Sequence, residues 1–197
     1  MNAQQSHAQA LQAAPHTFRV ALEQLRQAVT REELELNEVP APAKLAPYAV
    51  AMSADVTAPN GDAMAVGRFI MLYDPHYSEV WEGNFRIVTY IKTRLESDLG
   101  QEPLVSEVAW TWMVEALEYA KATYRQPGGT ASRVLSQGFG MLDQHIETID
   151  LELRASWTPA GDHLDRHLTA WSDMVCTFAG LPPVTEGVIP FNPNRRK

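Results

Sequence analysis

The sequence predicts an α+β fold in which helices cover one face of a mainly antiparallel, five-stranded sheet, in the order α-β-β-β-α-β-β-α. Between Tyr48 and Glu96 the apolar residues recur with a period of two, which is typical of strands with one buried face. Segments 104–124 and 164–178 instead carry apolar residues at helical spacing, without an internal glycine or proline. Short links between the strands favour antiparallel pairing.

A single domain is expected, because a compact chain of 197 residues buries about 70% of the surface that its unfolded form exposes. Residues 1–14 are rich in Gln and Ala, which predicts a disordered N-terminus. Residues 15–181 form the predicted domain. Residues 182–197 are rich in proline and lack periodicity, so we expect an irregular C-terminal arm that is either free or laid over the domain surface.

The first helix is expected from Pro15 onward, because a proline is tolerated in the first turn. Its apolar positions are Phe18, Leu22, Leu25 and Val29. Thr30 and Glu33 then match a capping box, but three prolines between residues 40 and 47 forbid a long helix. The sequence therefore predicts an extended connector before the sheet.

Three strands are expected between residues 48 and 98. The first alternates from Tyr48 and ends at an Asn-Gly turn in 59–62, and the second covers 64–74. The third lies within 80–98. One of its faces is apolar, with Phe85, Ile87, Ile91 and Leu95, and the other is polar, with Glu82, Asn84, Arg86, Lys92 and Arg94.

A helix is predicted over 104–124, with Ser106 as its N-cap and the pair Gly128–Gly129 as its stop. Its apolar residues surround nearly the whole circumference, so we expect it to be covered on most sides. Strands follow over 130–139 and 146–157. The inward positions of the second are Ile149, Leu151, Leu153, Ala155 and Trp157.

The last helix is the most sharply bounded element. Gly180 occupies the position of a C-terminal cap and two prolines follow. Its apolar residues recur at steps of four and three, namely Leu164, Leu168, Trp171, Val175 and Phe178. We expect the five tryptophans of the chain to belong mostly to the core, since large aromatic residues at helical spacing usually pack there.

Charge and composition exclude several classes of function. Sixteen Lys and Arg against 24 Asp and Glu give a net charge of −8, which repels phosphate backbones, so nucleic acid is not an expected partner. The single cysteine, Cys176, cannot form an internal disulfide. No segment resembles a signal peptide or approaches the ~20 apolar residues needed to cross a bilayer. A cytoplasmic protein without a membrane partner is expected.

Several stretches together resemble a known family. They are "VPAPAKLAPYAVAM", "GRFIMLYDP", "WEGNFRIVTYI", "EVAWTWMVEAL", "LELRASWTP" and "HLTAWSDMVCTFAGLPPVTEGV". They resemble an actinobacterial domain-of-unknown-function family over about residues 38 to 188. The resemblance implies a bacterial cytosolic protein and assigns no catalytic residue. The order of elements is also similar to that of type III secretion chaperones and their stand-alone relatives, which concerns topology alone.

Catalytic and metal motifs are weak. His163 and His167 stand four residues apart on a helix, as two zinc ligands can, but Leu164 occupies the place where the hydrolytic motif has a glutamate. Two exposed histidines near a helix start are the simpler interpretation. Cys176 is expected to be a buried, inert thiol. "QPGGT" lacks the strand-to-helix context of a phosphate loop, and no cofactor is expected.

The charged strand face allows two interpretations. Its mixed signs are typical of cross-strand ion pairs, each of which contributes only ~0.2–1 kcal/mol. Alternatively, the arginines bind an anionic ligand or an acidic partner segment, with aromatic anchors beside them. The candidate binding residues are Arg68, Glu82, Arg86, Tyr90, Arg154 and Trp157.

The leading functional hypothesis is a non-enzymatic, chaperone-like or adaptor protein that holds another protein on the uncovered sheet face or with its C-terminal arm. A homodimer is a further alternative. The second hypothesis is a small-molecule enzyme or ligand sensor whose site is formed by Arg86, Arg154 and Glu82, with His163 and His167 as additional candidates. The absence of a recognisable nucleophile, metal cluster or phosphate loop in the sequence favours the first.

Overall fold

A computed structural model describes residues 14–42, 44–95, 102–142 and 147–183. Within these residues, one six-stranded sheet has the order β1-β2-β3-β4-β6-β5, and all neighbouring strands run antiparallel. The α+β class is confirmed. In chain order the elements are α2 (His16–Arg26), β1 (Leu34–Val39), β2 (Tyr48–Thr57), β3 (Ala63–Ser78), β4 (Gly83–Leu95), α4 (Val105–Tyr119), β5 (Tyr124–Ser136), a 3-10 turn (Gly140–Leu142), β6 (Thr148–Pro159) and α5 (Leu164–Phe178).

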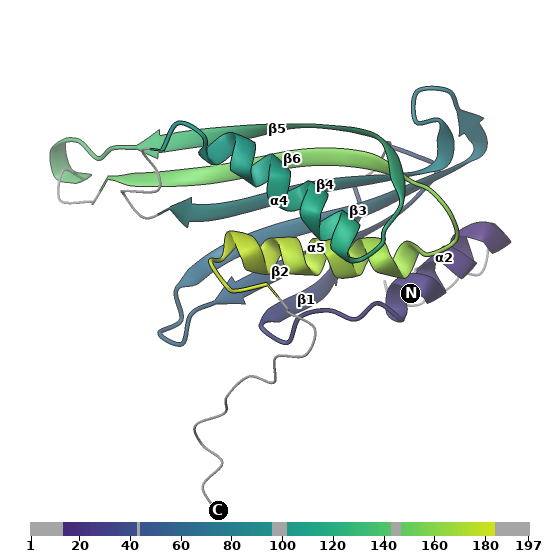
Figure 1. Ribbon diagram of the computed structural model, residues 1–197, viewed down its shortest axis with the longest axis horizontal. Coiled ribbons are helices and arrows are strands. Elements are labelled where there is room, and N and C mark those ends of the chain that lie inside the picture. The colour runs from purple at the N-terminus through teal and green to yellow at the C-terminus, as the bar shows by residue number, and fades with distance from the viewer. Residues whose placement is uncertain (1–13, 43, 96–101, 143–146, 184–197) are drawn as a thin grey trace, which may run out of the picture.

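Helices α4 and α5 lie side by side over one face of the sheet, and α2 packs against α5 (Figure 1). Helix α5 crosses the half of the sheet formed by β1 to β4, whereas α4 covers β5 and β6. The helices and the sheet approach each other closely at two glycines of the sheet. A Cβ atom on Gly67 would lie 2.8 Å from the ring of Trp171, and one on Gly129 would lie 3.0 Å from the ring of Trp110.

Strand β1 corrects the prediction of five strands. The segment expected to be an extended connector pairs with β2, from Leu34 opposite Val56 to Val39 opposite Ala51. The prolines follow this strand and limit its length, but they do not interrupt it. The capping-box pattern at Thr30 therefore precedes a strand and not a helix. Helix α2 is also shorter than predicted, since it ends at Arg26 and leaves Val29 78% exposed.

The alternation predicted for β2, β3, β4 and β6 is confirmed. Ile87 and Ile91 in β4, and Leu151 and Leu153 in β6, are fully buried on the helix-covered face. The Asn-Gly turn closes the β2–β3 hairpin, with Gly61 at a φ of 89°. Strand β3 extends to Ser78, four residues beyond the predicted end, through an irregular pairing with β4.

Helix α4 differs most from its prediction. It is buried on a single face, by residues at steps of four: Val105, Ala109, Met113 and Leu117. It therefore is not covered on most sides. The helix begins at Val105 with Leu104 in the N-cap position and without a side-chain cap, so Ser106 lies inside the first turn. It ends at Tyr119, and the glycine pair 128–129 belongs to β5.

Helix α5 has the predicted bounds and the predicted buried face. Its C-terminal turn closes through backbone hydrogen bonds, from Gly180 N–H to the Thr177 carbonyl at 2.9 Å and from Leu181 N–H to the Cys176 carbonyl at 3.0 Å. Gly180 has a φ of 76°, a left-handed conformation in which a side chain would be strained. The glycine stop after this helix is thus confirmed.

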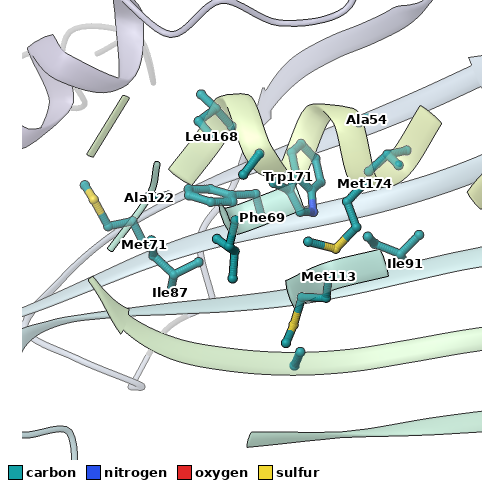
Figure 2. Packing of buried hydrophobic residues seen from close by; sticks show 14 of the residues in the cluster. Ala54, Phe69, Met71, Ile87, Ile91, Met113, Ala122, Leu168, Trp171 and Met174 are labelled. Atoms are coloured by element: carbon teal, nitrogen blue, oxygen red, sulfur yellow. The ribbon is translucent and has the colours of Figure 1, made fainter. Parts of the chain in front are cut away.

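The core lies between α5, α4 and the sheet (Figure 2). Trp171 from α5 packs against Phe69 from β3 with ring centroids 5.5 Å apart, and its indole Nε1 donates to Thr89 Oγ1 at 2.7 Å. Trp157 and Trp171 are fully buried, whereas the other three tryptophans are partly exposed. Burial of each such side chain stabilises the fold by roughly 1.5–3 kcal/mol.

Some predictions concern segments beyond this description. Of the predicted disordered segment 1–14, only Ala14 is described, and it is buried. Of the predicted arm 182–197, only Pro182 and Pro183 are described. The predicted strand positions 96–98 and 146 also lie outside the described residues. None of the helices in the described ranges is long and apolar enough to cross a membrane.

Candidate functional site

The sheet face opposite the helices carries a row of side chains that stand directly across from one another. Register places Ser53 opposite Arg68, Arg68 opposite Tyr90, Tyr90 opposite Arg154, and Arg154 opposite Thr130. Directly opposite residues in an antiparallel sheet project from the same face. We call Arg68, Tyr90 and Arg154 the arginine row. Three of the six residues proposed from the sequence as a binding site therefore come together on neighbouring strands.

Tyr90 is the centre of the arginine row. The guanidinium carbon of Arg154 lies 5.2 Å from the centroid of the Tyr90 ring, which is cation–π geometry. The same guanidinium bonds to Glu152 Oε2 at 2.8 Å. Burial, followed by the nearby Glu152 carboxylate, raises the pKa of the Tyr90 hydroxyl. The phenol is thus a neutral hydrogen-bonding group beside a cation that is already oriented.

Arg68 has a different environment. It is exposed, and among the described residues its guanidinium makes neither an ion pair nor a side-chain hydrogen bond. Its Cα lies two strands away from that of Arg154, about 10 Å at the usual strand spacing. Arg68 therefore offers an uncompensated positive charge with all of its donors available to a ligand.

Two shallow hollows flank the arginine row on this face. The first has a volume of about 500 Å³ and an apolar floor that includes Ile70 and Val88, with Thr130 and Ser156 at its rim. The second has a volume of about 600 Å³ and lies on the side of Ser53 and Asp55. Arg68, Tyr90 and Arg154 line both hollows. Together they make one open depression that crosses the middle of the sheet.

The charged residues toward one end of the face neutralise one another. Lys92 Nζ lies 2.8 Å from Asp150 Oδ2, and Arg94 Nε lies 3.9 Å from Asp150 Oδ1. The hydrogen bond to Asp150 raises the pKa of Lys92. These contacts are cross-strand ion pairs of the kind that the sequence predicted. They account for the charged residues at this end of the face, but not for Arg68.

Arg86 does not project freely into the depression. Its Nη1 donates to the Gln126 carbonyl at 2.8 Å and to Thr158 Oγ1 at 3.1 Å, and its Nη2 donates to Ser156 Oγ at 2.7 Å. Burial lowers the pKa of this guanidinium. Arg86 thus ties β4 to β6 and β5, and both of its Nη atoms already donate to protein acceptors. These contacts give Arg86 a structural role, and its expected role in ligand binding stays a prediction.

Glu82 and Trp157 also lie away from the arginine row. Glu82 precedes β4 at a φ of 52° and accepts a 2.6 Å hydrogen bond from Gln126 Nε2. Trp157 is fully buried on the helix-covered face of β6, opposite Ile87. It cannot contact a ligand on the uncovered face, and the expectation that it would act as a flat anchor there is wrong.

The two histidines do not form a metal pair. The side chain of His163 is exposed at the start of α5, 3.8 Å from Asp165 Oδ1. His167 is buried and its Nδ1 accepts a 3.1 Å hydrogen bond from Trp157 Nε1. Burial lowers the pKa of His167 to about 4, partly opposed by Asp165. The expectation that both histidines are exposed is thus wrong for His167. Within the described ranges, no three His, Cys, Asp or Glu side chains gather in a way that could hold a metal ion.

Cys176 is the buried packing residue that the sequence predicted. Burial raises the pKa of its thiol to about 11, and the nearby Arg31 opposes this only in part. The thiol is therefore protonated at neutral pH. A protonated, inaccessible thiol is a poor nucleophile.

Sequence reasoning missed the contribution of β5 to the depression. Gly128 and Gly129 line the first hollow beside Thr130, whereas the glycine pair was expected to end a helix. The available signal was the run of alternating residues after the glycines, since a glycine within a strand pattern indicates a bulge or a close approach. The pairing of β5 with β6 is indeed irregular between Arg125 and Gly128.

Comparison with known proteins identifies a family, but no similar protein of known activity. No curated protein and no solved structure matches the chain. The model of one protein family, described as a protein of unknown function (DUF3000), matches residues 14–189. This match includes all six strands and the three helices of the described residues, and the chain therefore belongs to the DUF3000 family.

Proposed function

We propose that this protein is a binding module that holds an extended, acidic segment of a partner protein across the uncovered face of its sheet. The observation that carries the proposal is the arginine row. Arg68 stands without a carboxylate partner among the described residues, next to Tyr90 and the oriented Arg154. Guanidinium groups in fixed positions bind carboxylates through charge-assisted, often bidentate hydrogen bonds.

The shape of the face favours a polypeptide over a small molecule. Pockets for small ligands usually enclose 70–90% of the ligand surface, whereas the helices lie on the opposite face and leave this depression open (Figure 1). An extended segment can lie along such a surface and fill both hollows. Its carboxylates would meet Arg68 and Arg154, and an aliphatic residue would rest on Ile70 and Val88.

The overall charge of −8 does not prevent this contact. Charges farther apart than a Debye length, about 8 Å at physiological salt, are largely screened. The arginine row therefore acts mainly at contact distance. Association that depends on these two arginines is expected to be modest in affinity and sensitive to salt.

Site-specific photo-crosslinking tests the proposal. A photoreactive residue replaces Thr130 at the rim of the first hollow in the full chain, within cells that naturally produce the protein. A second chain carries the same residue at Glu107, on the exposed side of α4. We expect an adduct from position 130 alone, attached to an acidic segment of another protein when mapped by mass spectrometry.

Charge reversal makes the test specific. Arg68→Glu should abolish the adduct, whereas Arg19→Glu, the same charge change at an exposed position of α2, should leave it unchanged. An adduct that survives Arg68→Glu, or one attached to a basic or uncharged segment, would contradict the proposal. An adduct with a second copy of the same chain would instead establish the homodimer as the arrangement on this face.

A small anionic ligand is the second candidate, favoured by the apolar floor of the first hollow and by the side chains of Arg68 and Arg154 that line it. A ligand present at 100 times its dissociation constant stabilises a protein by about 2.7 kcal/mol. Thermal unfolding with inorganic phosphate or succinate should then show an increased midpoint that Arg68→Glu removes. Unchanged midpoints with both probes would argue against this candidate.

A chaperone-like role in a bacterial cytoplasm remains a proposal of the same kind. Only the uncovered sheet face supports this role. Neither the family match nor the other comparisons show the predicted similarity to type III secretion chaperones.

A further inference from the structure

The outer side of α4 carries an exposed apolar stripe. Leu104, just before the helix, is 59% exposed, Val108 is 39% exposed and Tyr119 is 53% exposed. Together with the partly buried Trp112, these residues recur at steps of four, four and seven, so they lie on one side of the helix. Trp112 packs edge-on against Phe178 of α5, with ring centroids 5.4 Å apart, and the described residues leave Leu104, Val108 and Tyr119 exposed.

A hollow adjoins this stripe between α4 and α5. It has a volume of about 420 Å³, and Trp112, Ala116 and Tyr119 make up its apolar lining. Glu115 and Asp173 are its charged lining residues, and they carry the same sign. Burial raises the pKa of Asp173, which is consistent with a position inside the hollow and not on a solvated rim. The hollow therefore suits an occupant with apolar side chains and positive charge.

The described end of the chain borders this hollow. Pro183, the last described residue, is part of the lining. Its approach is fixed by Arg31, whose Nη1 donates to the Pro182 carbonyl at 3.1 Å. The guanidinium of Arg31 is also held by two hydrogen bonds to Glu33, at 2.7 and 3.0 Å. Arg31 is thus a positioning residue that holds Pro182, and with it Pro183, beside the hollow.

The remaining segment has the composition that the hollow requires. Residues 184–197 contain four apolar residues, Val184, Val188, Ile189 and Phe191, and end with three cations, Arg195, Arg196 and Lys197. The family match continues through residue 189, beyond the end of α5 and through Val188 and Ile189. Residues 184–189 therefore belong to the part of the chain that the family model matches.

We propose that residues 184–197 of the same chain dock in the hollow between α4 and α5, with Val188, Ile189 and Phe191 on the apolar stripe and the terminal cations near Glu115 and Asp173. The length is sufficient. Five residues beyond Pro183 extend at most about 17 Å, and Trp112 is separated from Tyr119 by about 10 Å along the helix. A short tether also raises the effective concentration of the segment to the millimolar range, so that a weak intrinsic affinity suffices.

Cysteine accessibility in the full chain tests this docking. Thr177 lines the hollow, and its Oγ1 donates to the carbonyl four residues earlier, Asp173, at 2.9 Å. Thr17, exposed on α2 and remote from both the hollow and the stripe, is the control. Thr177→Cys and Thr17→Cys are compared for their rates of alkylation by iodoacetamide. The buried Cys176 provides the background.

The decisive comparison combines each cysteine with the triple substitution Val188→Asp, Ile189→Asp and Phe191→Asp. A segment that is docked nine-tenths of the time lowers the alkylation rate about tenfold. We therefore expect the triple substitution to accelerate the reaction of Thr177→Cys about tenfold and to leave that of Thr17→Cys unchanged. Reversal of the three terminal cations to Glu should give a smaller acceleration that fades at high salt.

Two outcomes would overturn the proposal. Equal alkylation rates of Thr177→Cys with and without the triple substitution would show that the segment does not cover the hollow. Protection that depends on protein concentration and not on residues 188–191 would assign the hollow to a second copy of the chain. Neither outcome bears on the arginine row, which lies on the opposite face of the sheet.

Discussion

The indole Nε1 of Trp157 donates a 3.1 Å hydrogen bond to Nδ1 of His167, joining β6 to α5 where both side chains are almost completely buried. An indole N–H is only a donor, so Nδ1 must be the unprotonated nitrogen of a neutral imidazole. Protonation of that nitrogen would break the bond and leave a charge in the core. The fold therefore depends on the neutral form of His167.

This dependence predicts a loss of stability in acid. The pKa of His167 falls from 6.5 in the unfolded chain to about 4 in the folded protein. Between these values the unfolded state binds more protons, so the free energy of unfolding decreases as the pH falls from about 6.5 to about 4 and is constant above this range. The contribution is on the order of 3 kcal/mol.

Urea denaturation at several pH values checks this prediction. His167→Gln keeps an acceptor for Trp157 but does not titrate, so its free energy of unfolding should depend less steeply on pH than that of the unchanged protein. The carboxylates titrate in both proteins and cancel in the comparison. Parallel pH profiles would show that His167 is not responsible.

Gly67 should not tolerate a side chain. A Cβ atom there would lie 2.8 Å from both Trp171 Cζ2 and Val175 Cγ2. Gly67→Ala is expected to lower the free energy of unfolding by about 1–3 kcal/mol, the usual cost of overpacking a core. Gly128→Ala is the control, because its Cβ would meet nothing within 4 Å, and it should be neutral or stabilise by about 0.4–1 kcal/mol. Val175→Ala should partly rescue Gly67→Ala if the clash is the cause.

The two arginines of the sheet face should differ in their effects on stability. Arg86→Met removes three hydrogen bonds to β5 and β6 and should cost about 1–3 kcal/mol, because partly buried acceptors lose their donors. Arg68→Met removes no bond to a described residue and should change stability by less than about 0.5 kcal/mol. Chemical denaturation measures both. Equal costs would mean that Arg68 is also structural, which would weaken the proposed binding site.

Thr89 should be required as an acceptor in the core. Its Oγ1 accepts from Trp171 Nε1 at 2.7 Å and donates to the Arg68 carbonyl at 3.0 Å. Thr89→Val would leave the buried indole N–H without a partner, at a cost of about 1–3 kcal/mol. Thr89→Ser retains the hydroxyl and should cost less. Combining Thr89→Val with Trp171→Phe should then cost less than the sum of the two single changes.

Much of the secondary structure could be read from the sequence because its signals are local. The alternation in β2, β4 and β6 and the glycine stop of α5 depend on neighbouring residues, and the structure has them where the pattern indicates. Where a local signal was ambiguous the prediction failed. The prolines after residue 39 concealed β1, and the paired glycines 128–129 suggested a helix stop although they belong to β5.

The sequence by itself determined that one face of the sheet would be charged and that the other would be aliphatic and packed against large aromatic side chains. The reason is that the pleat of a strand fixes which residues share a face. Only the tertiary structure decided which of those charges are free. The pairing of β4 with β6, and of β6 with β5, gives Arg86 its three acceptors and leaves Arg68 without a partner among the described residues. Such differences arise from contacts between segments distant in the chain, and no local pattern encodes them.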